Sequence, residues 1–262
     1  MFADFYETDK NKLDQKYSQY SLSKCPHCGM VPVEEKTKKF KCNNCNEFVF
    51  VKKINYKYYF LTESQSKEVG EMRKFDALKE KYFNTLVNNG YAQNQLDNDF
   101  DRNKITSIEQ LKDFIWSSLN NMVNANANDL KAKSFLYFAM ATYCANERDG
   151  NNVYDFQKLA FDYKLEGFLK GLSTDNSLTY EVTIISAPTN PECYKDHSRI
   201  LSVNDAVTKQ MLPHKVEGNK HGCCCTYGFR AKRDGDGNLQ LRSQLSRPNL
   251  FLSKCLLSYV SF

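Results

Sequence analysis

Two Cys-x-x-Cys pairs constrain the fold of this chain more than any other feature. Cys25 and Cys28 form the first pair, Cys42 and Cys45 form the second, and thirteen residues separate the two pairs. Four thiolates spaced in this way can surround one metal ion as a tetrahedron, which is the arrangement of structural zinc sites. The sequence therefore predicts one zinc ion held by four cysteines, with an iron centre or a redox-active cysteine pair as alternatives.

The residues around these pairs favour a small β-structure. The segments MVPVEE, KKFKC and EFVFVKK alternate in polarity or are rich in β-formers, and YKYYFLTESQ follows as a last strand and turn. Each pair needs a tight turn. Pro26 and Gly29 suit the first turn, and Asn43, Asn44 and Asn46 suit the second, because glycine and asparagine tolerate positive φ. We therefore expect residues 21–63 to form a zinc ribbon. His27 stands between two ligands and is expected to face solvent.

The overall composition predicts a folded protein without a membrane anchor. Apolar residues make up 41% of the 262 residues, which is enough for a hydrophobic core. The first residues are polar and charged, unlike a secretory signal, and no stretch approaches the ~20 uncharged apolar residues of a membrane span. These features predict a cytoplasmic protein. In that compartment the ten cysteines are expected to be metal ligands or buried thiols rather than disulfides.

Basic residues concentrate at the two cysteine-rich ends of the chain. Residues 24–57 contain eight lysines against three glutamates, and residues 212–254 contain eight lysines and arginines against three acidic residues. Residues 70–175 instead carry thirteen basic and fifteen acidic residues. A basic balance favours polyanionic partners, although lysines also serve solubility. The predicted nucleic-acid contacts are Lys36, Lys38, Lys39, Lys41, Lys52, Lys53, Arg230, Lys232 and Arg233.

The middle of the chain, residues 64–175, has helical periodicity and predicts a bundle of about five helices. A capping box is predicted at Thr106 and Glu109, where apolar residues at helical spacing begin. Asp129 is expected to cap the next helix. Its segment SFLYFAMATYCA is apolar on nearly every face and is expected to lie at the buried centre of the bundle. Cys144, in this segment, is interpreted as a buried thiol.

The chain is thus expected to have an α+β fold in four parts. Residues 1–20 predict a short helical arm, residues 21–63 the zinc ribbon, and residues 64–175 the helical bundle. Residues 176–262 predict a Cys/His-rich α+β module that begins with the strand-like segment SLTYEVTIISAP, stopped by Pro188. The segment RDGDGN in this module has part of a calcium-loop pattern, but it lacks the closing glutamate and predicts a β-turn.

A second possible metal site lies in residues 190–229, which hold four cysteines and three histidines. In an extended segment, Cys223 and Cys225 point to one side and Cys224 points to the other. The simplest predicted site is a second zinc ion bound by Cys193, His197, Cys223 and Cys225. Two further histidines are reserve ligands, His214 and His221. The alternative is a cluster of reduced thiols with unrelated histidines.

The order of residues at this end resembles a C-terminal motif of phage head-morphogenesis proteins, also called minor head proteins. The match comprises a cysteine, the segment SRILSVNDA, the tripeptide LPH and a cysteine cluster followed by Thr-Tyr. The family pattern is Pro-x-Cys-x-x-Cys, a short helix, Leu-Pro, His and Cys-Arg-Cys. The chain departs from this pattern at three places. Asp196 and His197 replace the second cysteine, and Cys224 replaces the arginine. His221 stands two residues before Cys223, where the family more often has a spacing of three. Related zinc-ribbon proteins share this arrangement, and the resemblance implies a phage-encoded protein, virion-associated or in the host cytoplasm.

Together these features predict a non-enzymatic zinc-binding protein that contacts nucleic acid or a protein partner, as a phage or mobile-element assembly or regulatory factor. No catalytic residue is assigned, because the sequence has no P-loop, dinucleotide glycine pattern, serine-hydrolase elbow or kinase motif set. One alternative is a metal-dependent nuclease that uses Asp196, His197, Asn219 and His221. Another alternative is a protein inhibitor that acts through the helical bundle.

Overall fold

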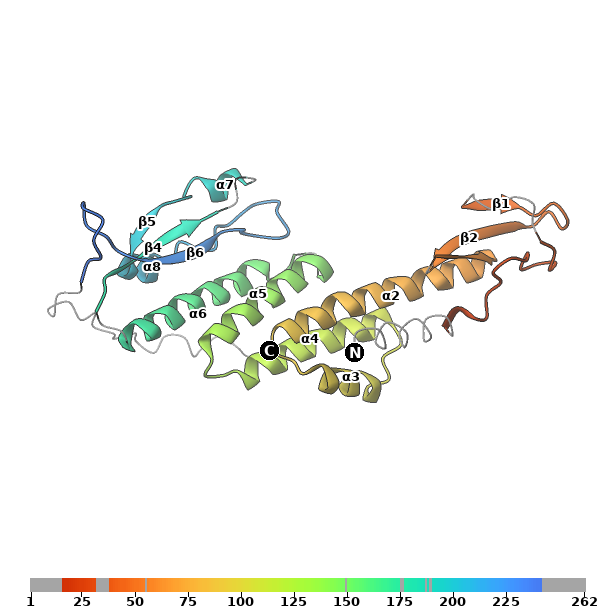
Figure 1. Ribbon diagram of the computed structural model, residues 1–262, viewed down its shortest axis with the longest axis horizontal. Coiled ribbons are helices and arrows are strands. Elements are labelled where there is room, and N and C mark those ends of the chain that lie inside the picture. Colours follow the sequence, from red (N-terminus) through yellow and green to blue (C-terminus); the bar gives the residue numbers. More distant parts are fainter. Residues whose placement is uncertain are drawn as a thin grey trace. The chain divides into compact units, whose positions relative to one another are not determined.

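The computed structural model confirms the predicted α+β class (Figure 1). The chain forms two compact units, of which one comprises Met1–Phe83 with Thr106–Leu111 and the other Asn84–Ile105 with Lys112–Phe262. The four-part division expected from the sequence stays a prediction, and most of the predicted arm lies outside the described residues. Within the described part of the chain, no helix is both long and apolar enough to cross a membrane. The structure describes residues 16–31, 38–54, 56–148, 150–174, 177–186, 188 and 190–241.

The first unit contains a three-stranded antiparallel sheet in the order β1-β2-β3. Successive side chains of β2 point to opposite faces of this sheet. On one face, Val49 and Val51 pack with Phe60. They contact two buried cysteines, Cys25 and Cys42, which come one from each Cys-x-x-Cys pair. The sheet and the cysteine group therefore share one small core. The strands are β1 (Lys39–Lys41), β2 (Phe48–Ile54) and β3 (Lys57–Leu61).

Five helices follow the sheet, as the sequence predicted for this part of the chain. They are α2 (Glu63–Asn88), α3 (Gln93–Arg102), α4 (Ile108–Ala125), α5 (Leu130–Glu147) and α6 (Val153–Thr174). Aromatic side chains join α4 to α5 and α6, because the Trp116 ring lies 5.7 Å from Tyr143 and 5.6 Å from Phe156. The Tyr143 hydroxyl also donates to the Lys112 carbonyl of α4 at 2.8 Å.

The capping box of α4 lies one residue later than predicted. The Ser107 hydroxyl accepts from the Gln110 amide at 3.1 Å, and the Gln110 side-chain oxygen accepts from the Ser107 amide at 3.2 Å. The same oxygen also accepts from the Thr106 amide at 2.9 Å. The predicted pair of Thr106 and Glu109 was wrong, because Gln110 reaches two backbone donors at once and Ser107 completes the reciprocal pair.

Helix α5 has the predicted cap but is not buried all round. The Asp129 carboxylate accepts from the Ala132 amide at 2.9 Å, which confirms Asp129 as the cap. Cys144 is fully buried, as expected for a structural thiol. Phe135 is 57% exposed, however, so the expectation of a helix buried on nearly every face was too strong.

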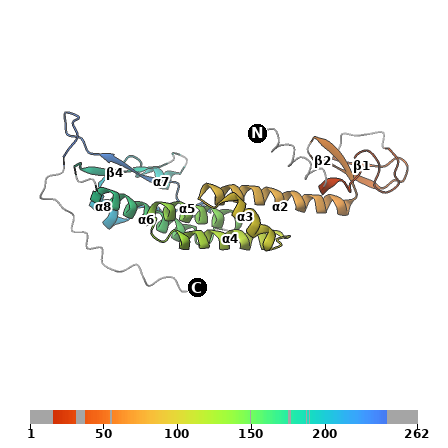
Figure 2. The same cartoon turned by 60° about the horizontal axis from the view of Figure 1, so that its bottom comes forward.

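The C-terminal part of the second unit is a three-stranded antiparallel sheet in the order β5-β4-β6, which lies over α6 in both views (Figures 1 and 2). Phe161 and Leu165 of α6 pack into the core of this module, and the Phe161 ring meets Tyr227 edge-on at 5.6 Å. RDGDGN forms a turn, in which the Asp234 carboxylate accepts from the backbone. The elements are β4 (Tyr180–Ile185), α7 (Pro191–Tyr194), β5 (Ile200–Ser202), α8 (Val203–Lys209) and β6 (Thr226–Ala231).

Candidate metal centres

The first centre is the group of four sulfurs that the sequence predicted. The sulfurs of Cys25, Cys28, Cys42 and Cys45 all lie within 4.8 Å of one another. Cys25 and Cys45 are 3.8 Å apart, and Cys28 and Cys42 are 3.7 Å apart. Four sulfurs at about 2.3 Å from a central zinc would stand about 3.8 Å from each other. The donor set and its spacing therefore fit one tetrahedral ion.

Two similar turns bring these sulfurs together. In the first, the Gly29 amide donates to the Cys25 carbonyl at 2.9 Å, and Gly29 has a φ of 74°. In the second, the Asn46 amide donates to the Cys42 carbonyl at 2.9 Å, and Asn46 has a φ of 59°. Glycine and asparagine tolerate this left-handed conformation. Gly29 thus has its predicted role, and Asn46 is the one of the three predicted asparagines that adopts positive φ.

Backbone amides in these turns point at the sulfurs and favour their charged form. The Met30 amide, followed by the Asn44 side chain, lowers the pKa of Cys28 to about 6. The backbone amides of Cys45 and Asn44 lower the pKa of Cys42. A thiolate, rather than a thiol, is the metal ligand.

The pKa of Cys25 is instead raised, mainly by burial. The Glu47 amide acts to lower the pKa of Cys45, but burial and the neighbouring cysteines outweigh it and raise that pKa to about 12. The turns therefore favour the thiolate at two of the four positions.

His27 stays outside the first centre. Its side chain is exposed, and its Nε2 lies 3.2 Å from the Phe48 carbonyl. This agrees with the expectation that His27 faces solvent rather than the metal.

The second centre brings three of the four predicted ligands together. The ligand atoms of Cys193, Cys223 and Cys225 form a group with His214, all within 4.8 Å of one another. Cys193 and Cys223 have their sulfurs 3.8 Å apart, and His214 Nδ1 lies 3.3 Å from the Cys225 sulfur. Three sulfurs and one imidazole nitrogen are a common ligand set of structural zinc.

His214, which the sequence offered only as a reserve, occupies the place predicted for His197. Cys193 and His197 are four residues apart, and such a pair lies on one face of a helix that contains both residues. Because α7 ends at Tyr194, His197 lies beyond the helix and does not share a face with Cys193. His197 instead stacks on Tyr194 with ring centroids 5.1 Å apart, and its Nδ1 accepts from the Ser186 amide at 3.2 Å. One feature of the sequence could have identified His214 as the ligand. It is the histidine of the Leu-Pro-His tripeptide, which is part of the resemblance to phage head-morphogenesis proteins.

A carboxylate holds the ring of His214. Asp196 Oδ2 lies 3.0 Å from His214 Nε2, and Asp196 Oδ1 accepts from Arg199 at 2.8 Å. The Arg199 guanidinium, followed by His214, keeps the pKa of Asp196 below its usual value. An ionised carboxylate at Nε2 fixes the proton there and leaves Nδ1 as the lone-pair donor toward the sulfurs. Asp196 is therefore a positioning residue for His214.

Gln157 of α6 anchors the cysteine loop to the helical part of the second unit. Its side-chain nitrogen donates to the carbonyls of His221 and Cys223 at 3.1 and 2.9 Å, and its oxygen accepts from the Cys223 amide at 2.9 Å. Gly222 has a φ of 70°, and a Cβ there would lie 2.5 Å from the Gln157 oxygen. The close approach of loop and helix thus requires glycine. Nothing in the sequence pattern marked Gln157 for this role.

Two further cysteines in the described part of the chain, Cys144 and Cys224, belong to neither centre. Cys224 is exposed whereas Cys223 and Cys225 are buried, as the predicted alternation requires. Burial raises the pKa of Cys144, which makes this thiol unreactive.

The predicted nucleic-acid contacts lie in two different settings. On the ribbon, Lys39 and Lys41 both lie over the exposed ring of Phe48, and Lys53 lies 5.6 Å from the ring centre of Tyr56. In the C-terminal module, Arg230 pairs with Glu181, and Arg233 donates to the Gly237 carbonyl at 2.6 Å. Lys38 and Lys232 are exposed, Lys52 is half-buried, and Lys36 lies outside the described residues.

Comparisons with protein-family models, curated proteins and solved structures found no match. The resemblance to phage head-morphogenesis proteins therefore stays a prediction from the sequence. The structure establishes one point about the chemistry of this chain. Two groups of side chains, one of cysteines and one of cysteines with a histidine, could each hold a metal ion.

Proposed function

We propose that this is a zinc-binding protein that contacts single-stranded nucleic acid through one face of its N-terminal ribbon. Both cysteine groups serve as structural zinc sites, because four protein ligands leave no open position for a substrate. The contact surface is a set of two lysines and two phenylalanines on β1 and β2, called here the Lys–Phe face: Lys39, Lys41, Phe48 and Phe50. This arrangement is the observation that carries the proposal.

The strand register gathers the Lys–Phe face. Lys39 is paired with Phe50 and Lys41 with Phe48, so all four side chains point to the same side of the sheet. The Lys39 ammonium lies 4.1 Å from the ring centre of Phe48 and 4.9 Å from that of Phe50. Phe48 is 47% exposed. Cations and accessible aromatic rings are thus interleaved on one surface.

Packing of the ribbon core does not account for Phe48. The core beside the cysteines takes residues from the opposite face of the sheet, where Phe40 meets Phe60 edge-on at 5.8 Å. Phe50 is half-buried and contacts a second cluster that includes Leu61. Phe48 belongs to neither cluster, so its ring remains available to a ligand.

The chemistry of this face suits a nucleic-acid strand. Bases stack on accessible aromatic rings without regard to sequence, and lysines neutralise the phosphates between them. The excess of lysine in this part of the chain raises the local concentration of polyanions. Two of the three predicted C-terminal cations already have partners within the protein, so the proposal assigns the main contact to the ribbon.

The test is binding of labelled single-stranded DNA and RNA, measured by fluorescence anisotropy at several salt concentrations. Phe48→Ala is expected to weaken binding roughly 5- to 150-fold, because one base–ring stack is lost. Tyr58→Ala is the matched control, since Tyr58 is 45% exposed on the other face of the same sheet. This control should bind like the unchanged protein.

The contribution of the two lysines is tested separately, by the salt dependence of binding. Replacing Lys39 and Lys41 together by glutamine is expected to reduce the slope of log affinity against log salt concentration by about 1.4. Binding that ignores salt, or that is equally weakened by Phe48→Ala and Tyr58→Ala, would contradict the proposed surface.

The nuclease alternative has less support. Both carboxylate oxygens of Asp196 are engaged, by Arg199 and by His214. The Nδ1 of His197 accepts from the backbone of Ser186. Asp196 and His197, which this alternative would use for acid–base chemistry, therefore already serve the fold.

A further inference from the structure

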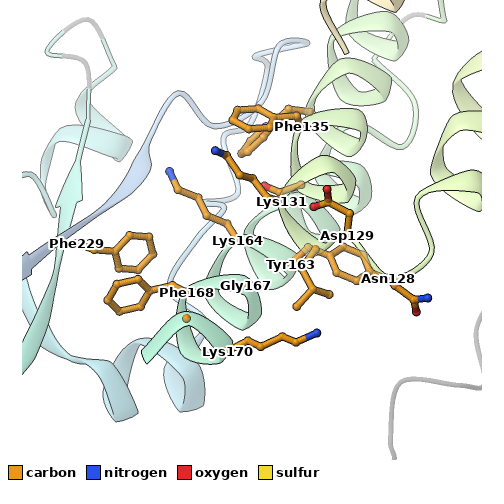
Figure 3. A pocket seen from close by; sticks show the side chains of 14 residues that line it. Asn128, Asp129, Lys131, Phe135, Tyr163, Lys164, Gly167, Phe168, Lys170 and Phe229 are labelled. Atoms are coloured by element: carbon orange, nitrogen blue, oxygen red, sulfur yellow. The ribbon is translucent and has the colours of Figure 1, made fainter. Parts of the chain in front are cut away.

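A cavity of about 900 Å³ opens between α5, α6 and the strand β6 of the second unit (Figure 3). Its wall is largely apolar and includes the rings of Phe138, Phe168 and Phe229, of which the last two stack on each other with centroids 3.8 Å apart. A mostly apolar cavity of this size with a few polar groups is typical of small-molecule sites. Neither cysteine centre contributes a ligand to its lining.

Two lysines give this cavity a positive end. Figure 3 shows the ammonium groups of Lys131 and Lys164 extending into the same region, whereas the ammonium group of Lys170 extends the other way. Neither Lys131 nor Lys164 has an ion-pair partner among the described residues. Asp129, the acidic residue of the lining, uses its carboxylate to cap α5. Asp129 supplies one negative charge against the two ammonium groups, so the positive charge of Lys131 and Lys164 is only partly balanced within the cavity.

Lys164 is held in place by a neutral group. Its ammonium donates to the Thr226 hydroxyl at 2.6 Å, which fixes its direction but supplies no counter-charge. Burial lowers the pKa of Lys164, in keeping with a desolvated cation. A bound anion would provide the missing charge and regain part of the lost solvation energy.

Two glycines of α6 lie on the cavity wall, and one of them, Gly171, leaves space there. Gly167 and Gly171 stand four residues apart in α6, so both lie on the helix face that lines the cavity. Glycine is less favourable than alanine within a helix. A Cβ at Gly171 would nevertheless meet no atom within 4 Å, so packing does not demand glycine there. A larger side chain at this position would instead extend into the space that a ligand needs.

We propose that this cavity binds a small amphipathic organic anion, with its apolar acyl or aryl body against the phenylalanines and its acidic head at Lys131 and Lys164. The charge of the two lysines excludes an organic cation, and the apolar wall disfavours a bare inorganic anion. The site is separate from the Lys–Phe face, so it does not depend on the proposed nucleic-acid binding.

The test uses two dyes that share one ring system and differ in charge. The full-length, zinc-loaded protein is titrated with 8-anilinonaphthalene-1-sulfonate, which is anionic, and with neutral N-phenyl-1-naphthylamine. We expect one tight site for the anionic dye. Lys164→Met should weaken its binding about tenfold and leave the neutral dye unaffected. Lys158→Met is the matched control, because Lys158 is an exposed residue of α6 outside the lining and its loss should change neither affinity.

A second variant separates loss of the site from loss of the fold. Gly171→Leu should abolish the binding of both dyes while the thermal midpoint stays the same or rises, since leucine favours the helix. The proposal is overturned if the anionic dye binds Lys164→Met as tightly as the unchanged protein. It is also overturned if Gly171→Leu retains the site, or if the neutral dye binds more tightly than the anionic one.

Discussion

Replacing His214 by alanine is expected to weaken the binding of the second metal ion at least about a hundredfold, whereas replacing His197 leaves it unchanged. The reason is geometric: His214 Nδ1 lies 3.3 Å from the Cys225 sulfur, and the Nδ1 of His197 accepts from the backbone of Ser186. Loss of an outer partner alone already costs ten- to a hundredfold in metal affinity, and loss of a ligand costs more. Competition with a chromogenic zinc chelator measures the effect.

His197→Ala is the matched control for this experiment, because both histidines come from the same module and were both candidates on sequence grounds. A further variant, Asp196→Asn, should lie between the two, since it keeps the ligand but removes the charge that orients it. If His197→Ala releases the metal as readily as His214→Ala, the assignment of the fourth ligand is wrong.

Replacing Cys42 by serine is expected to unfold the ribbon while the second unit keeps its structure. Cys42 is one of five buried residues in the small core beside the sheet, and another of the five, Cys25, is also a ligand. A core of this size cannot hold three short strands alone, whereas a structural zinc site contributes about 10–16 kcal/mol in small zinc domains. Hydrogen exchange followed by mass spectrometry should show lost protection in Phe48–Leu61 and unchanged protection in α5 and α6.

Cys224→Ser is the control for that substitution, because Cys224 is exposed and belongs to neither centre. It should retain full protection of the ribbon strands. Protection of β2 that survives in Cys42→Ser would show that the sheet is stable without its metal, and the structural role of the first centre would then have to be abandoned.

The first centre was predictable because its geometry is local. Each Cys-x-x-Cys turn is closed by hydrogen bonds within six residues, and Gly29 and Asn46 sit where positive φ is needed. The cap at Asp129 was predictable for the same reason. For α4, the same local reasoning placed the cap at Thr106, one residue before the observed cap at Ser107.

The second centre was only partly predictable because its geometry is tertiary. Its ligands come from α7, from the segment after α8 and from the loop just before β6, so sequence spacing does not decide which histidine meets the sulfurs. The anchoring by Gln157 depends on α6 lying beside the cysteine loop, and no local pattern announces it. The exposure of Phe48 was not predictable for the same reason. It depends on which face of the sheet packs against the cysteines.

The zinc content per chain decides whether two structural metal centres hold this fold. Elemental analysis of the purified protein should find about two zinc ions per chain, and about one after Cys193→Ser, because Cys193 belongs only to the second group. One zinc ion in both proteins would leave the ribbon as the sole metal centre and contradict the account of the second unit.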